Sequence, residues 1–106
     1  HPDIVRSIHE DYIDCGAEII ITNTFSSSRH AMRSAGIEDR FEVLTNAAVR
    51  LAREARENKG KQEVLIAGGI THWIWTEDKP SLEELEANTR DQAVLMAKGE
   101  CDLIHQ

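Results

Sequence analysis

Polar side chains and paired glycines follow two apolar segments of the chain, and they are the residues best suited to bind a ligand. Thr22, Asn23 and Thr24 come directly after the first segment, and Gly68 and Gly69 end the second. Hydroxyls and an amide at the carboxyl end of a strand can hold a small polar ligand, and glycines there let a ligand or a backbone approach closely. Capping of the next helix by the hydroxyls, and a simple tight turn at the glycines, remain open alternatives.

The apolar segments that position these residues read as strands of a parallel sheet. Residues 17–21 and 63–67 are short, nearly continuous runs rich in β-branched residues, and residues 102–105 form a third run. Such runs are typical of strands covered on both faces. The sequence therefore predicts an α/β fold with roughly three adjacent parallel strands.

Apolar residues at helical spacing fill the stretches between the strands. They predict helices at residues 3–14, at a short segment ending near Arg33, at residues 39–58, and from the N-cap Ser81 to Lys98. Three serines at 26–28 are N-cap candidates for the short helix, or they could face an anionic ligand. In the first helix the expected core-facing residues are Ile4, Val5, Ile8 and Tyr12, and in the last they are Leu82, Leu85, Ala93, Met96 and Ala97.

Length and termini indicate a segment of a larger unit. A chain of 106 residues suffices for one small domain, whereas a complete (β/α)₈ barrel takes about 250 residues. The chain begins at His1 without a methionine and stops inside a predicted strand. We therefore expect both ends to be truncated, and the chain to supply about three of the eight βα units of a barrel.

Charge and cysteine content exclude several classes of partner. The net charge is −7 and the basic residues are dispersed, which argues against a nucleic-acid surface or an anionic membrane surface. The sequence has no apolar run near the roughly 18 residues of a membrane span. Two cysteines, Cys15 and Cys101, lack paired spacing, so free thiols in the cytoplasm are expected.

The sequence motif around the first predicted strand resembles that of the homocysteine S-methyltransferase family. The family pattern His-x-x-Tyr-Ile-x-x-Gly-Ala-(Asp/Glu)-Ile-Ile-x-Thr-Asn-Thr-Phe is matched by His9, Tyr12, Ile13, Gly16, Ala17, Glu18, Ile19, Ile20, Thr22, Asn23, Thr24 and Phe25. Residues 46–55 are similar to the family's next helix, residues 67–70 to its Gly-(Ser/Asp)-Ile strand end, and Gly99 with residues 102–104 to the start of its following strand. The resemblance covers nearly the whole chain.

The resemblance implies a (β/α)₈ barrel that transfers a methyl group from a sulfonium, ammonium or folate donor to the thiol of homocysteine, forming methionine. Thr22, Asn23, Thr24, Gly68 and Gly69 would then bind substrate. It also implies zinc held by three cysteines that lie outside this chain, because neither cysteine present matches a family ligand. No catalytic residue and no metal ligand is expected within residues 1–106. Homocysteine and a methyl donor are the implied small-molecule partners, and assembly into a homo-oligomer is left open.

Other interpretations stay open at this point. The chain could come from a non-catalytic barrel relative that serves as a binding or assembly subunit, or from a barrel lyase or aldolase. His30, His72 and His105 could lie near strand ends and bind a metal, although their spacing is irregular. The chain departs from the family at residues 71–76, where Trp73 and Trp75 could roof a pocket, line an interface or pack on the barrel.

Overall fold

Three parallel strands form the sheet of the computed structural model, which describes residues 1–25, 27–71 and 80–105. The strands are β1 (Ile19–Ile21), β2 (Leu65–Gly69) and β3 (Leu103–His105), and they are hydrogen-bonded in the order β1-β2-β3. β1 pairs in parallel with β2, and β2 in parallel with β3. The predicted α/β class and the three adjacent parallel strands are confirmed.

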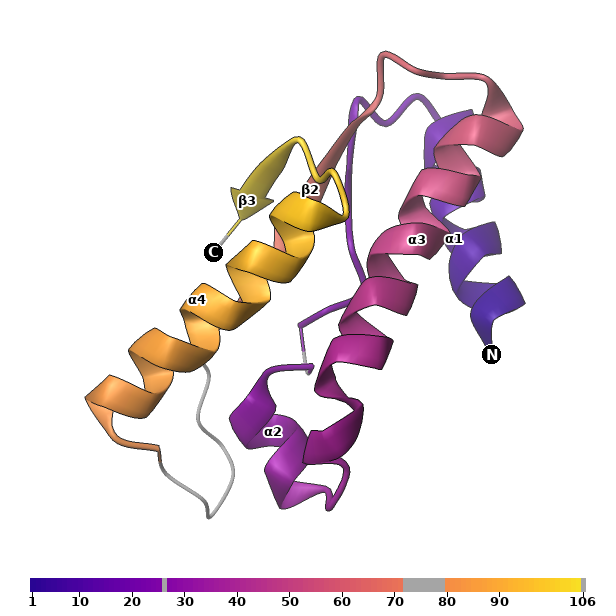
Figure 1. Cartoon of the computed structure of the whole chain (residues 1–106). Helices are drawn as coiled ribbons and strands as arrows, with labels where there is room; N and C mark the ends of the chain where they lie inside the picture. The colour runs from indigo at the N-terminus through magenta and orange to yellow at the C-terminus, as the bar shows by residue number, and fades with distance from the viewer. Residues whose placement is uncertain (26, 72–79, 106) are drawn as a thin grey trace.

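Helices precede and connect the strands, as Figure 1 shows. They are α1 (Pro2–Asp14), α2 (Arg29–Ser34), α3 (Phe41–Lys59) and α4 (Leu82–Lys98), with a short 3₁₀ turn, η1 (Glu38–Arg40), before α3. The predicted helices agree with these bounds within a few residues. α3 begins two residues later than predicted, because residues 39 and 40 belong to the 3₁₀ turn. His72, Trp73 and Trp75, which the sequence singled out, lie outside the described residues.

Each of the helices α1 to α4 is followed by a residue with a left-handed backbone conformation. Gly16, Gly36 and Gly60 have φ of 96°, 75° and 63° after α1, α2 and α3. Glu100 takes the same position after α4 with φ 67°, which costs a residue with a Cβ more than it costs glycine. Ser81 accepts a hydrogen bond from the backbone N–H of Glu84 at 3.2 Å, so the predicted N-cap of α4 is confirmed.

One face of the sheet is covered by helices and the other is open. Ile20 and Ile66 pack with Ile13 of α1 and with Ala52 and Ala55 of α3 in a buried cluster. On the opposite face Ile19, Ile21 and Leu65 are exposed. The described residues do not meet the expectation of strands covered on both faces, because α1, α3 and α4 pack on one side of the strands and no described helix covers the other. This one-sided cover is the arrangement of a barrel wall, with helices outside and the open face turned inward.

The buried face of α1 differs from the predicted one. His9 and Ile13 are buried against α3, whereas Ile4, Ile8 and Tyr12 are exposed. The apolar spacing in α1 therefore marks a face that nothing in the described part of the chain covers. Polar side chains of α1 and α3 make contacts at the edge of their interface, and apolar periodicity in the sequence does not reveal such contacts.

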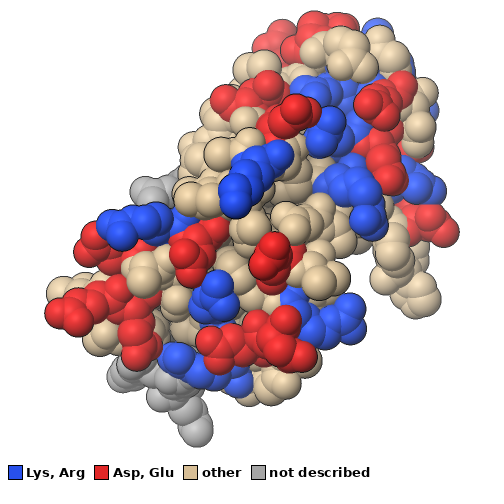
Figure 2. Space-filling model, viewed as in Figure 1, with Lys and Arg blue, Asp and Glu red and all other residues tan. Residues whose placement is uncertain are grey.

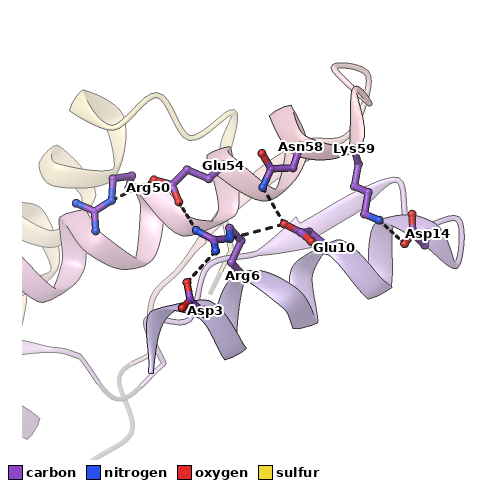
Figure 3. Close-up of polar contacts among 8 residues, drawn as sticks. All are labelled: Asp3, Arg6, Glu10, Asp14, Arg50, Glu54, Asn58 and Lys59. Atoms are coloured by element: carbon purple, nitrogen blue, oxygen red, sulfur yellow. Dashed lines mark hydrogen bonds and ion pairs between the residues drawn. The ribbon is translucent and has the colours of Figure 1, made fainter.

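Ion pairs join α1 to α3 along one side (Figure 3). Arg6 lies 2.8 Å from Asp3 and 3.2 Å from Glu54 of α3, and Lys59 lies 2.7 Å from Asp14. Asn58 donates a hydrogen bond to Glu10 at 2.9 Å. Exposed pairs of this kind contribute little individually, so they fix the relative position of the two helices more than they stabilise the fold.

The predicted core stripe of α4 is only partly correct. Met96 is fully buried and Ala93 packs beside it on Val49 and Ile70. Leu82 is 84% exposed, and Ala97 is exposed as well. Gln92 is buried in their place, which the apolar pattern could not predict because glutamine is normally a surface residue.

Candidate functional site at the carboxyl ends of the strands

A closed ring of hydrogen bonds joins the carboxyl ends of β1 and β2. The backbone N–H of Gly69 donates to the Thr22 hydroxyl at 3.1 Å, and the Thr24 hydroxyl donates to the Gly69 carbonyl. The two hydroxyl oxygens lie 2.8 Å apart. Because a hydroxyl has one proton and that of Thr24 is used on Gly69, Thr22 donates to Thr24. The ring thus runs from the Gly69 N–H through both hydroxyls back to the Gly69 carbonyl.

The Thr22 side chain continues the hydrogen bonding between β1 and β2 beyond the last backbone hydrogen bond of β1. Its own N–H donates to the Ala67 carbonyl at 2.9 Å, as a strand residue would. Its hydroxyl then accepts from Gly69, in place of the next backbone acceptor. Thr22 and Thr24 are buried, at 4% and 0% exposure. Both hydroxyls are therefore buried at the strand ends, where their hydrogen bonds connect β1 to β2.

The two glycines face opposite sides of the sheet. A Cβ on Gly68 would lie 2.4 Å from Sδ of Met96, so Gly68 is where α4 packs on β2. A Cβ on Gly69 would lie 3.1 Å from Cγ2 of Ile21, on the open face. Of the two glycines predicted to bind substrate, Gly69 faces the open side of the sheet and Gly68 faces α4, because successive strand residues alternate between faces.

The loop after β1 is tied to α4 through the Thr24 carbonyl. That carbonyl accepts from the Ser27 N–H at 3.2 Å, the Ser27 hydroxyl at 3.0 Å and the buried Gln92 amide at 3.5 Å. Ser28 occupies the N-cap of α2 as predicted, but its hydroxyl pairs with Nε2 of buried His30 at 3.2 Å and caps no backbone N–H. The hydroxyls of Ser27 and Ser28 therefore both make hydrogen bonds within the protein, and Ser28 is buried beside His30 and does not face a ligand.

A depression of about 350 Å³ lies over the carboxyl ends of the three strands. It is lined by Ile21, Thr22, Phe25, Gly69, Ile70, Thr71 and His105. A groove of about 470 Å³ adjoins it along β1 and α1, shares Ile21 and Thr22 with it, and has Asn23 in its wall. Volumes of this size suit a small metabolite.

The predicted site residues therefore divide into two groups. Thr22 and Gly69 line the depression, and exposed Asn23 lines the adjoining groove. Thr24 and Gly68 lie beneath it. Reasoning from the sequence missed Phe25 and Gln92 as parts of this region. Phe25 stands in the quoted motif, so its position after the strand was an available signal, whereas nothing in the sequence marks Gln92.

The described residues do not fit a metal centre. No group of three or more His, Cys, Asp or Glu side chains that could hold a metal ion occurs within residues 1–25, 27–71 and 80–105. Cys15 is exposed at the end of α1, and Cys101 lies before β3. Burial, with the neighbouring Asp102 carboxylate, raises the pKa of the Cys101 thiol and so disfavours the thiolate that a metal would need.

Charge on the surface is mixed. Figure 2 shows Lys and Arg interspersed with Asp and Glu on the face viewed, in a chain whose net charge is −7. Among the described residues, no helix is both long and apolar enough to cross a membrane.

Parallel strands, helices on one face and a depression at the carboxyl ends of the strands define the class as part of a (β/α)₈ barrel. The family model of homocysteine S-methyltransferase matches residues 1–105. The chain belongs to this family.

Curated relatives agree with the family assignment. The chain is 40% identical over 70 residues to the S-methylmethionine–homocysteine S-methyltransferase of Pongo abelii, a match that spans 66% of this chain and 17% of the relative. It is 29% identical over 106 residues to betaine–homocysteine S-methyltransferase 1 of Danio rerio, spanning 98% of this chain and 26% of the relative. The chain thus spans about a quarter or less of the length of these relatives.

Solved structures show the same fold. The homocysteine methyltransferase of Escherichia coli superposes with a TM-score of 0.81 in its metallated form and 0.79 in its oxidized form, at 24% and 23% identity. Each match covers 98% of this chain and 41% of the solved chain. The predicted barrel fold with outer helices is therefore confirmed for this segment.

Proposed function

We propose that the protein containing this chain is a homocysteine S-methyltransferase, and that residues 1–106 are one segment of its homocysteine-binding barrel domain. The observation that carries the proposal is the family match over residues 1–105, together with a depression at the strand ends where such barrels bind ligands. The homocysteine thiol loses its proton to solvent, and its sulfur forms a bond to the methyl carbon as the donor–methyl bond breaks, giving methionine and the demethylated donor.

In this reaction the chain's own residues bind and orient. The ring of Thr22, Thr24 and Gly69 fixes the carboxyl ends of β1 and β2 relative to each other. Asn23, between the two threonines, is exposed and its side chain makes no hydrogen bond to the described residues, so its amide is available to a substrate. Holding both reactants in an attack geometry is the main contribution expected of such residues.

Donor, metal, location and assembly belong to the same proposal. Relatives are named for S-methylmethionine and betaine, a sulfonium and a quaternary ammonium compound, so we expect an onium donor, with a folate donor as the alternative. Zinc is the proposed metal, and because the described residues hold no suitable cluster, its ligands belong to other parts of the protein. Two free cysteines favour the cytoplasm. Assembly of the whole protein into a homo-oligomer is proposed as well, without a role for the open sheet face, which is turned inward in a barrel.

The test is methyl transfer to homocysteine by the longest natural protein that contains this chain, assayed with S-methylmethionine, betaine and a methylfolate. Losing one buried hydrogen bond to a substrate typically costs about 1 to 3 kcal/mol, so Asn23→Ala should lower kcat/KM roughly 5- to 150-fold with zinc content unchanged. Asn46→Ala, at an exposed position on α3, is the matched control and should leave activity intact.

The proposed function fails if the wild type does not methylate homocysteine with any of these donors. The placement of the substrate site at these strand ends fails if Asn23→Ala and Thr24→Ala both leave kcat/KM within about twofold while circular dichroism shows the fold preserved. A wild-type protein that binds homocysteine without methylating it would instead favour the second candidate, a non-catalytic barrel relative.

A further inference from the structure

The depression at the strand ends has one titratable side chain among its lining residues, His105. We propose that His105 is a substrate-binding residue that holds the α-carboxylate of the amino-acid thiol. The inference rests on the proposed function and names the group of the substrate that is recognised at this edge of the sheet.

The strand register places His105 on the open face. His105 pairs with Gly69, and the preceding pair is Ile104 with Gly68. A Cβ on Gly68 would meet Sδ of Met96 and, at 3.2 Å, Cδ1 of Ile104, so that pair faces α4. His105 and Gly69 therefore face the other way, since strand residues alternate. Gly69 has no side chain, which leaves space beside the imidazole.

The chemistry of the depression singles out His105 as the group for an anion. Ile21, Ile70 and Phe25 offer apolar surface, and the Thr22 hydroxyl is engaged in the ring with Thr24 and Gly69. Thr71 also lines the depression, but its side chain is not ionisable and cannot neutralise a carboxylate. The His105 imidazole is exposed and makes no hydrogen bond to the described residues. An imidazole N–H donates to a carboxylate, and the bond is stronger when the ring is charged.

The lining of the depression contains no Lys or Arg, so His105 supplies its one side-chain nitrogen donor for a carboxylate. Apolar walls beside His105 would exclude water from a bound carboxylate and so strengthen its contact with the ring. The same walls suit the methylene groups of an amino-acid thiol.

The experiment compares homocysteine with 3-aminopropane-1-thiol, which keeps the thiol and amine but lacks the carboxyl group. It uses the longest natural protein that contains this chain and whichever donor supports turnover. His105→Phe, which keeps a ring but no donor, should lower kcat/KM for homocysteine roughly 10- to 150-fold, mainly through KM, and leave that of the decarboxylated analogue within twofold. His105→Gln should recover part of the loss, and His1→Phe, at an exposed position outside the depression, should change neither substrate.

Equal losses on both substrates would show that His105 only supports the structure, and no loss on either would remove it from the site. Both results overturn the inference while leaving methyl transfer by the wild type intact. Failure of the wild type to methylate homocysteine would overturn the proposed function, and the inference with it.

Discussion

Thr22 and Thr45 offer a direct comparison of the value of a buried hydroxyl. The Thr22 hydroxyl accepts from Gly69 and donates to Thr24. The Thr45 hydroxyl is buried in α3 without a hydrogen-bond partner among the described residues. The same substitution to valine, which keeps the shape of the side chain, therefore removes two hydrogen bonds at one site and none at the other.

Thr22→Val should lower the free energy of unfolding by about 1 to 3 kcal/mol, because the buried Gly69 N–H loses its acceptor. Thr45→Val should be neutral or stabilising, since it removes a buried polar group that has no partner. Urea denaturation of both variants measures the difference. Equal destabilisation by the two substitutions would mean that the ring at the strand ends does not stabilise the fold.

Individual residues also show where prediction from sequence succeeded. The motif at 22–25 and the glycine pair at 68–69 located the strand ends correctly, because a change from apolar to polar residues has a local physical cause. The ring between the threonines and Gly69 was not predictable, since it depends on two strands that lie 47 positions apart in the chain being brought into register. The opposite orientation of Gly68 and Gly69 likewise depends on where α4 packs.

At the scale of elements, α1 is held to α3 by a mixed polar and apolar face. Its buried residues are His9 and Ile13, and Nε2 of His9 has no hydrogen-bond partner among the described residues. Burial lowers the pKa of His9. The folded state therefore binds this proton less readily than the unfolded state does.

This linkage predicts a pH dependence of stability. The contribution of neutral His9 is fully present above about pH 6.5, the ordinary pKa of histidine, and is lost as the pH falls below that value toward the lowered pKa. The slope from one group is at most about 1.4 kcal/mol per pH unit. Thermal melts of the wild type and of His9→Gln between pH 7.5 and 5 should converge as the pH falls. Parallel curves for the two proteins would contradict the assignment.

The mispredicted faces of α1 and α4 have a common physical reason. Apolar spacing identifies a face that is buried somewhere, but it does not say against what. Ile4, Ile8 and Tyr12 of α1 and Leu82 of α4 are exposed here because the described residues supply no neighbour for them. The sequence thus predicted the presence and the ends of these helices better than it predicted which side of each helix packs on the sheet.

At the scale of the whole molecule, the sheet is bounded by β1 and β3, and its open face carries exposed Ile19, Ile21 and Leu103. Edge strands and contiguous apolar surface favour association. We expect residues 1–106, when produced as a separate chain, to dimerise or aggregate. Sedimentation over a range of concentrations measures this, and a monomer with a sharp, reversible and concentration-independent melt would argue against it.

The central claim is that the carboxyl ends of these strands bind homocysteine, and a crystal structure of the longest natural protein containing this chain, soaked with homocysteine, tests it most directly. The account predicts an amino acid in the depression bordered by Thr22, Gly69 and His105, with the ring of Thr22, Thr24 and Gly69 intact beneath it. Homocysteine bound at another face of the barrel, with this depression filled only by solvent, would contradict it.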